Sequence, residues 1–218
     1  MSNPSSIGKA ITENIRFISR LGAECDHLAK LIREEVSSAL LVPDVAQRYR
    51  AGGEWIEKFA NDEHGWVCTE MGFSLPVIVK PKRSVGGYIV VQISLTGAGI
   101  EAKENHEPLV HIGWWGAPID FEEFLMSFPI GLDSGFDLTL EGDRQFHWAH
   151  SQYDNEWTYS LYLADINSPA DVQASIVKPL KALLLGHEAT VALAGSRAVR
   201  YEKVQGEEDE GQYRVLPR

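Results

Sequence analysis

Residues 145–157, QFHWAHSQYDNEW, concentrate the side chains that could do chemistry: two Trp, two His, one Phe and one Tyr in thirteen positions. Histidine titrates near neutral pH, so His147 and His150 are candidates for general acid/base catalysis or for holding a metal ion. They are three residues apart, and on a β-strand they point to opposite faces. The flanking EGD and YDNE sequences favour a strand between turns. We therefore predict no metal site here.

Packing in the core and at the edge of a sheet explains most of these aromatic residues, and a tryptophan left uncovered would form a binding surface. Adjacent Trp114 and Trp115 must point to opposite sides of a strand, so only one of them can enter a core. The outward ring needs a covering helix, a partner or a ligand, because a lone exposed Trp is a large apolar area. Together with Trp148 or Trp157 it would form an aromatic patch suited to a protein hot spot or a planar ligand. The candidate binding residues are Trp114, Trp115, His147, Trp148, His150 and Trp157.

The alternative is an enzyme, with a cleft formed by His147, His150, Trp148 and the carboxylates around Asp137. It would bind a small ligand, or act as a metal-dependent hydrolase or nuclease. The sequence gives this hypothesis little help, because it contains no GxSxG, HExxH, GxxxxGK[ST] or GxGxxG pattern. A metal-dependent nuclease core requires Glu-x-Lys on its third strand. At the corresponding place this chain has Gln92 and no lysine two residues later. We predict no cofactor.

The N-terminal segment, residues 1–42, is predicted to form a long helix that ends before Pro43. Small or apolar residues follow one another at alternating spacings of four and three, which is typical of a helix packed along its length. They lie at positions 11, 15, 18, 22, 25, 29, 32, 36 and 39. This series is called the seam below. The helix either docks on its own domain or pairs with a second copy of the chain.

Residues 43–218 are predicted to form a single α+β domain, in which helices flank a mainly antiparallel sheet of five to seven strands. One short helix is expected between Pro43 and the Gly52-Gly53 pair and another around Trp55 to Ala60, with strands from Trp66 onwards. A further helix is expected in PIDFEEFLMSFP, residues 118–129. The helix with the clearest start and stop signals is expected over residues 168–186: Ser168 caps it, Pro179 lies in its interior and Gly186 ends it. A C-terminal hairpin turns at the acidic residues 207–210.

Composition limits the class of partner. The net charge of −11 repels phosphate backbones, so no direct nucleic-acid binding is expected, whereas a basic protein would be attracted. The two cysteines, Cys25 and Cys68, form no disulfide scaffold and are expected to be small buried hydrophobes. The first residues lack the apolar core of a signal peptide, and no apolar run approaches the roughly 20 residues that cross a bilayer. We expect a soluble, reduced, cytoplasmic protein without a membrane partner.

These observations favour a non-enzymatic protein-binding module of an inhibitor or immunity type, or one that binds another copy of itself. Its acidic surface would attract a basic protein, and its surplus tryptophans would supply the contact. A homo-oligomer formed through the N-terminal helix is the second form of this hypothesis. The deciding geometric question is whether the histidines meet at least two carboxylates in one concave pocket, as an enzyme would require.

Overall fold

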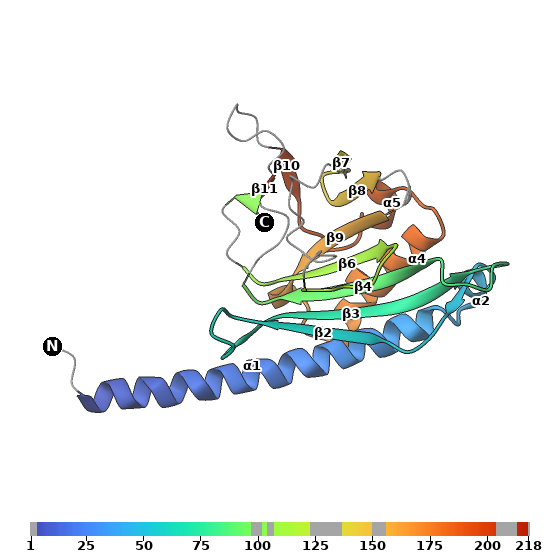
Figure 1. Cartoon of the computed structure of the whole chain (residues 1–218). Coiled ribbons are helices and arrows are strands. Elements are labelled where there is room, and N and C mark those ends of the chain that lie inside the picture. Colours follow the sequence, from blue (N-terminus) through green and yellow to red (C-terminus); the bar gives the residue numbers. More distant parts are fainter. Residues whose placement is uncertain are drawn as a thin grey trace.

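The computed structural model has an α+β fold, with a long N-terminal helix and a mostly antiparallel sheet, which confirms the predicted class (Figure 1). It describes residues 4–96, 102–103, 107–122, 137–149, 156–203 and 213–217. Within these ranges no helix is both long and apolar enough to cross a membrane.

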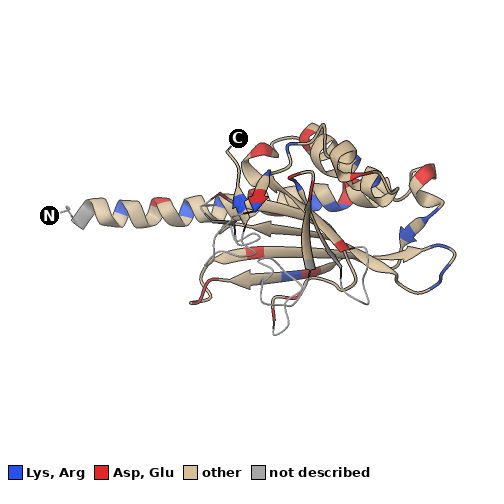
Figure 2. Ribbon diagram, turned by 90° about the horizontal axis from the view of Figure 1, so that it is seen from above, with Lys and Arg blue, Asp and Glu red and all other residues tan. Residues whose placement is uncertain are grey.

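The N-terminal helix, α1, spans Pro4–Ala39 and continues without a break through Gly22. At 1.5 Å per residue its 36 residues extend about 54 Å. The longest strand, β3, has 12 residues and extends about 40 Å. The helix is longer than the sheet that it covers, and its N-terminal part projects past the ends of the strands, as Figures 1 and 2 show.

The main sheet has eight strands in the order β1-β3-β4-β6-β9-β8-β7, with β2 also paired to β3. Every pairing in it is antiparallel. A smaller sheet has the order β10-β11-β5, in which β11 and β5 are parallel. The bounds are β1 Tyr49–Ala51, β2 Ile56–Asn61, β3 Cys68–Val79, β4 Gly87–Ser94, β5 Ala102–Lys103, β6 Leu109–Trp115, β7 Asp137–Glu141, β8 Gln145–Ala149, β9 Glu156–Tyr162, β10 Tyr201–Lys203 and β11 Tyr213–Val215.

One face of the main sheet, here called the helix face, packs against α1 and a second helical run. That run consists of α3 (Pro169–Val172), a π-helical turn (Gln173–Val177) and α4 (Lys178–Leu184). The seam supplies the α1 side of this core from its second half, with Cys25, Ala29, Ile32, Val36 and Ala39 all buried. Alternate residues of the strands supply the other side, including Val91, Ile112 and Tyr159. The remaining helices are short: α2 Pro43–Ala46, a 3-10 turn at Leu163–Asp165, and α5 Ala189–Ala192.

The local signals of the second helical run are confirmed. Ser168 caps α3 by accepting a hydrogen bond from the Asp171 N–H, and Pro169 takes the first helical position. The run is divided by the π-helical turn immediately before Lys178 and Pro179, where a proline cannot supply a backbone donor. Gly186 ends the run in a left-handed conformation, φ 87°.

One predicted element is wrong. The sequence before residue 61 indicated two short helices, but only α2 is helical and residues 56–61 form strand β2. β2 pairs with the first half of β3, from Ile56 opposite Ser74 to Asn61 opposite Cys68. Ladder hydrogen bonds to a neighbouring strand outweigh the weak helical pattern of so short a segment.

Other predictions lie wholly or partly outside the described residues. The helix expected over residues 118–129 falls mostly on undescribed positions, as do His150 and the acidic residues 207–210. The two arms of the C-terminal hairpin are described and pair as antiparallel strands β10 and β11.

Candidate functional site

The structure divides five of the six predicted binding residues between the two faces of the sheet, and the sixth, His150, lies outside the described residues. Trp114, His147 and Trp157 lie on the helix face, since Trp114 is opposite Trp157 and Trp157 is opposite His147 in adjacent strands. Trp115 points to the opposite face, where it is 1% exposed and donates a hydrogen bond from Nε1 to Thr158 Oγ1 at 2.9 Å. Trp148 belongs to that opposite face by its register, but its side chain is outside the described part of the chain.

Trp114, His147 and Trp157 meet at one pocket of about 390 Å³, here called the aromatic pocket. It lies where β1, β3, β6, β8 and β9 face the end of the second helical run. Its lining residues are Tyr49, Val79, Gly86, Trp114, His147, Trp157, Leu183, Leu184 and Gly186. Three of the six residues selected from the sequence are thus brought together by the fold.

Trp114 is held in place from two sides. Tyr49 meets it edge to face, with ring centroids 5.9 Å apart at 65°. On the other side the indole lies on the backbone of Gly87, so closely that a Cβ there would be 2.4 Å from Trp114 Cζ2. The absence of a side chain at Gly87 therefore makes room for a ring of the pocket.

Trp157 and His147 form the wall nearer the edge of the sheet. Trp157 is buried and stacks on Tyr159, with centroids 6.4 Å apart and planes 18° from parallel. His147 is half-buried, and Thr139 of the outermost strand is its partner across the ladder. The imidazole thus borders the pocket, and so does the indole of Trp157, which is also part of the core.

The carbonyl end of the second helical run forms the remaining wall. Tyr49 Oη donates a hydrogen bond of 2.8 Å to the Leu184 carbonyl, and Arg48 Nη1 donates one of 3.1 Å to the Leu185 carbonyl. The last carbonyls of a helix carry partial negative charge and attract cations. One guanidinium already lies at this helix end, and it comes from the residue beside Tyr49.

The enzyme hypothesis required a histidine and at least two carboxylates in one hollow. The lining of the aromatic pocket contains one imidazole, His147, and no carboxylate. Glu141 shares the helix face by strand alternation but is exposed and is not among the lining residues. No group of three His, Cys, Asp or Glu side chains suited to a metal occurs in the described ranges. The pocket as described therefore offers an aromatic surface rather than an acid/base pair.

Sequence analysis missed Tyr49, Leu183 and Leu184. Tyr49 was assigned to a helical region, and its contact with Trp114 joins residues 65 positions apart in the chain. The YRA segment before Gly52-Gly53 was the one local signal, since aromatic residues favour strands and paired glycines favour turns.

The face opposite the helices carries a buried polar cluster that the sequence also did not reveal. Glu70 accepts hydrogen bonds from Gln92 Nε2 at 2.8 Å, Ser94 Oγ at 2.9 Å and Thr96 Oγ1 at 3.2 Å. Burial raises the pKa of the Glu70 carboxyl, and these three hydrogen bonds oppose the increase. Four residues thus satisfy one another across β3 and β4, as buried polar groups must.

Farther along the same face, His111 Nδ1 is 2.8 Å from Ser160 Oγ, and His111 is 2% exposed. The two residues are directly opposite each other on β6 and β9. Nearby, burial raises the pKa of the Tyr201 hydroxyl, and a hydrogen bond with the Ser160 side chain opposes the increase.

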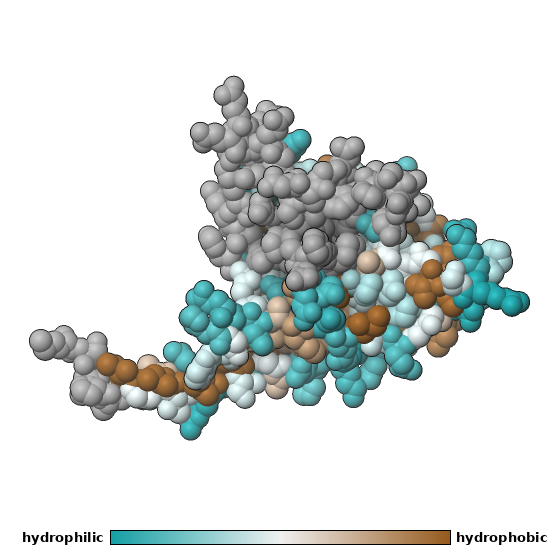
Figure 3. All heavy atoms as spheres, viewed as in Figure 1, coloured by the Kyte–Doolittle hydropathy of each residue, from teal (hydrophilic) through white to brown (hydrophobic). Residues whose placement is uncertain are grey.

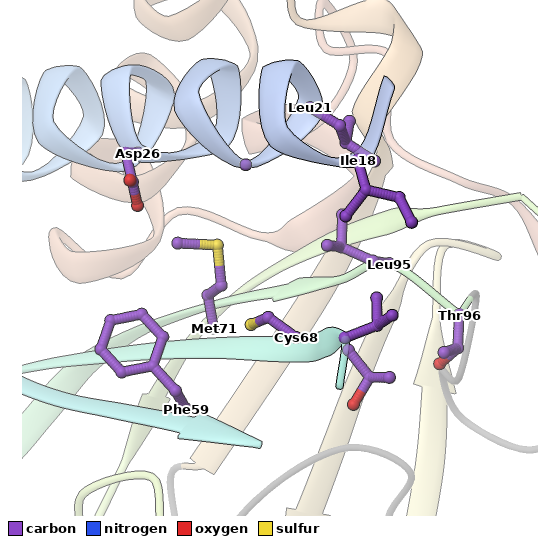
Figure 4. Close-up of a pocket in the computed structure, with 11 residues that line it drawn as sticks. Ile18, Leu21, Asp26, Phe59, Cys68, Met71, Leu95 and Thr96 are labelled. Carbon is purple, nitrogen blue, oxygen red and sulfur yellow. The ribbon is translucent and has the colours of Figure 1, made fainter. Parts of the chain in front are cut away.

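A second pocket lies where α1 leaves the sheet, and is here called the base pocket (Figure 4). It also has a volume of about 390 Å³, and its lining is mostly apolar. Ile18 and Leu21 enter it from the helix, and Phe59, Met71 and Leu95 from the strands. Beyond it, the projecting half of α1, here called the arm (residues 4–20), has no buried residue among those whose side chains are described.

No protein-family model, no curated protein and no solved structure matches this chain. Any functional conclusion must therefore come from these surfaces.

Proposed function

We propose that this chain is a protein-binding module, and that it binds a basic partner by taking an Arg or Lys side chain into the aromatic pocket. The observation that carries the proposal is the grouping of Tyr49, Trp114 and Trp157 at the carbonyl end of a helix. This combination favours cations over anions or neutral groups.

Two electrostatic effects act in the same direction. A cation over an aromatic face gains about 0.5–1 kcal/mol when exposed and about 2 kcal/mol when desolvated. The net charge of −11 attracts a basic protein from a distance and accelerates its association. The last carbonyls of the helix already accept hydrogen bonds from Arg48 and Tyr49, so the aromatic rings carry the local preference for a cation. A partner that displays Arg on a basic surface fits both effects, as expected for an inhibitor or immunity-type protein.

The test is a titration with a hexa-arginine peptide, followed by tryptophan fluorescence, since two of the pocket's walls are indoles. We expect saturable quenching that weakens as salt is added. His147→Arg places a like charge beside the pocket and should weaken peptide binding by at least tenfold. Ala174→Arg, at an exposed site on the π-helical turn, changes the net charge equally and is the matched control.

Two results would contradict the proposal. Equal weakening by His147→Arg and Ala174→Arg would show that the peptide senses only the overall charge. Saturable binding of N-acetyltryptophanamide without binding of hexa-arginine would favour a small planar ligand, which belongs to the competing class of function.

A second candidate function is self-association through the arm. The observation that favours it is the exposure of four isoleucines on a helix that covers nothing there: Ile7, Ile11, Ile15 and Ile18. Figure 3 shows this apolar surface along the projecting helix. Exposed apolar stripes of this kind are typical of association sites.

A further inference from the structure

We infer that two copies of this chain pair through their arms in antiparallel orientation, so that the tip of each arm lies against the base pocket of the other copy. The inference deepens the self-association proposed above. It is independent of the binding of a basic partner, because the arm and the base pocket share no residue with the aromatic pocket.

The first argument is the continuity of the seam. The residues from Cys25 to Ala39 are buried against the protein's own sheet, whereas Ile11, Ile15 and Ile18 occupy the same positions of the pattern and are 39% to 60% exposed. Ile7, four residues before Ile11, extends the series and is 52% exposed. One face of one helix is therefore covered in its second half and uncovered in its first.

The second argument is the symmetry of the stripe. The isoleucines at 7, 11, 15 and 18 have spacings of four, four and three, which read almost the same in both directions. In an antiparallel pair, Ile7 lies opposite Ile18 of the second copy and Ile11 lies opposite Ile15. The two-fold axis passes near Thr12 and Glu13. Such an isologous contact closes on itself and gives a dimer.

The third argument excludes the parallel arrangement. The seam of α1 faces the sheet from Cys25 onwards, so a parallel second helix that followed the seam would run into the sheet. An antiparallel second helix instead lies past the ends of the strands, on the same side of α1 as the sheet. The two sheets are then at opposite ends of the pair, as the overhang in Figure 1 allows.

The base pocket gives the incoming tip a place to lie. It opens at the end of the sheet where the second helix would arrive, and Ile18 and Leu21 form its helical side (Figure 4). A Cβ built on Gly22, which also lines it, would meet nothing within 4 Å, so a partner helix can approach closely there. Because Ile7 of the second copy lies opposite Ile18, its side chain is placed to fill this apolar hollow.

Charge attracts the arm of one copy to the body of the other. The segment 4–22 has three basic residues, Lys9, Arg16 and Arg20, and one acidic residue, Glu13, which is a net +2, whereas the whole chain carries −11 and the rest of it therefore −13. The tip of each arm is thus drawn to the acidic body at the other copy's base pocket, while the two arms carry like charge and associate through their isoleucines. Asp26 at the rim of the base pocket adds a local acidic group.

The experiment measures the oligomeric state of the full chain by sedimentation velocity across a wide range of concentration. The parent should show a monomer–dimer equilibrium. Ile11→Glu combined with Ile15→Glu should weaken dimerisation by at least a hundredfold, and the melting temperature measured at high dilution should stay the same because both residues are exposed in the monomer. Ser6→Glu combined with Phe17→Glu adds the same charge at exposed positions on the side of the arm away from the isoleucine stripe and should weaken dimerisation far less.

Cross-linking tests the orientation separately. In a Cys68→Ser background, Ile7→Cys and Ile18→Cys are mixed and treated with a short thiol cross-linker. The antiparallel pair predicts a mixed 7–18 product and little product from either variant alone, because like positions lie about 16 Å apart along the axis.

The outcomes separate the two levels of the proposal. A chain that stays monomeric at all concentrations overturns self-association and the pairing together. A dimer in which Ile7→Cys links mainly to itself overturns the antiparallel arrangement alone. A chain that stays monomeric but sediments with phosphatidylserine vesicles shows that the arm binds lipid instead, which also overturns the pairing. The hexa-arginine titration is unaffected by any of these results.

Discussion

Gly87→Ala tests the construction of the aromatic pocket most directly. The new methyl group would lie 2.4 Å from Trp114 Cζ2, 2.6 Å from Cε2 and 3.1 Å from Cη2. These atoms belong to one rigid ring, which Tyr49 borders on another side. Either the indole moves as a unit or strand β4 shifts. Gly87 has no positive φ, so the cost is steric rather than conformational.

The expected cost follows from overpacking. Extra methyl groups in a packed site cost about 1–3 kcal/mol, which for a domain of this size lowers Tm by about 2–12 °C. Urea and thermal melts measure the loss, and near-ultraviolet circular dichroism reports the displaced indole. Gly195→Ala is the matched control, because a Cβ there meets nothing within 4 Å. It should change stability by less than about 0.5 kcal/mol.

A double-mutant cycle makes the prediction specific. Trp114→Phe removes two of the three atoms that the new methyl group would touch, so adding Gly87→Ala to it should cost less than adding the same change to the parent. We expect a coupling energy of about 1 kcal/mol or more. Strictly additive effects, or a Gly87→Ala protein as stable as the Gly195→Ala control, would refute the argument that the ring lies against this glycine.

Three further predictions concern local stability. Gly22→Ala should stabilise the monomer by about 1 kcal/mol in urea melts, since the glycine is inside a continuous helix with open space around it; a loss of stability would mean that a side chain does not fit there. Ser168→Ala should destabilise the protein by about 0.5–2 kcal/mol, because Asp171 N–H loses its cap, and no change would show that the cap contributes nothing. Because burial raises the pKa of Glu70, its contribution to stability is complete below the unfolded pKa and is lost as pH rises through the folded pKa. The free energy of unfolding of the parent should therefore fall relative to Glu70→Gln as pH rises above about 4, the ordinary pKa of a Glu carboxyl, and parallel profiles would contradict this sign.

Features that depend on residues close in the sequence were predicted correctly, whereas features that depend on distant residues were not. Ser168, Pro169 and Gly186 were correctly placed because caps and left-handed ends depend on hydrogen bonds within a few residues. The segment from Trp55 to Ala60 was wrongly expected to be helical because its state is set by pairing with β3, whose partner residues lie up to 18 positions away, as for Ile56 and Ser74. Among the candidate residues, alternation showed that Trp114 and Trp115 point apart, but not which of them faces the helices.

That choice depended on contacts from distant parts of the chain. Trp115 is fixed by a hydrogen bond to Thr158, and Trp114 lies between Tyr49 and the backbone of Gly87. The residues that make each of these contacts are far apart in the sequence, so no local pattern could indicate them. The buried polar cluster around Glu70 has the same origin, since its hydrogen bonds cross from one strand to the next.

The sequence by itself determined that α1 is a helix with one continuous apolar seam, because a spacing of four and three residues places side chains on one side of any α-helix. Only the tertiary structure decided which half of that seam is covered. The strands reach about 40 Å and the helix about 54 Å, so the sheet ends before the seam does. The length of a sheet is a property of many paired segments, and a helix sequence carries no information about it.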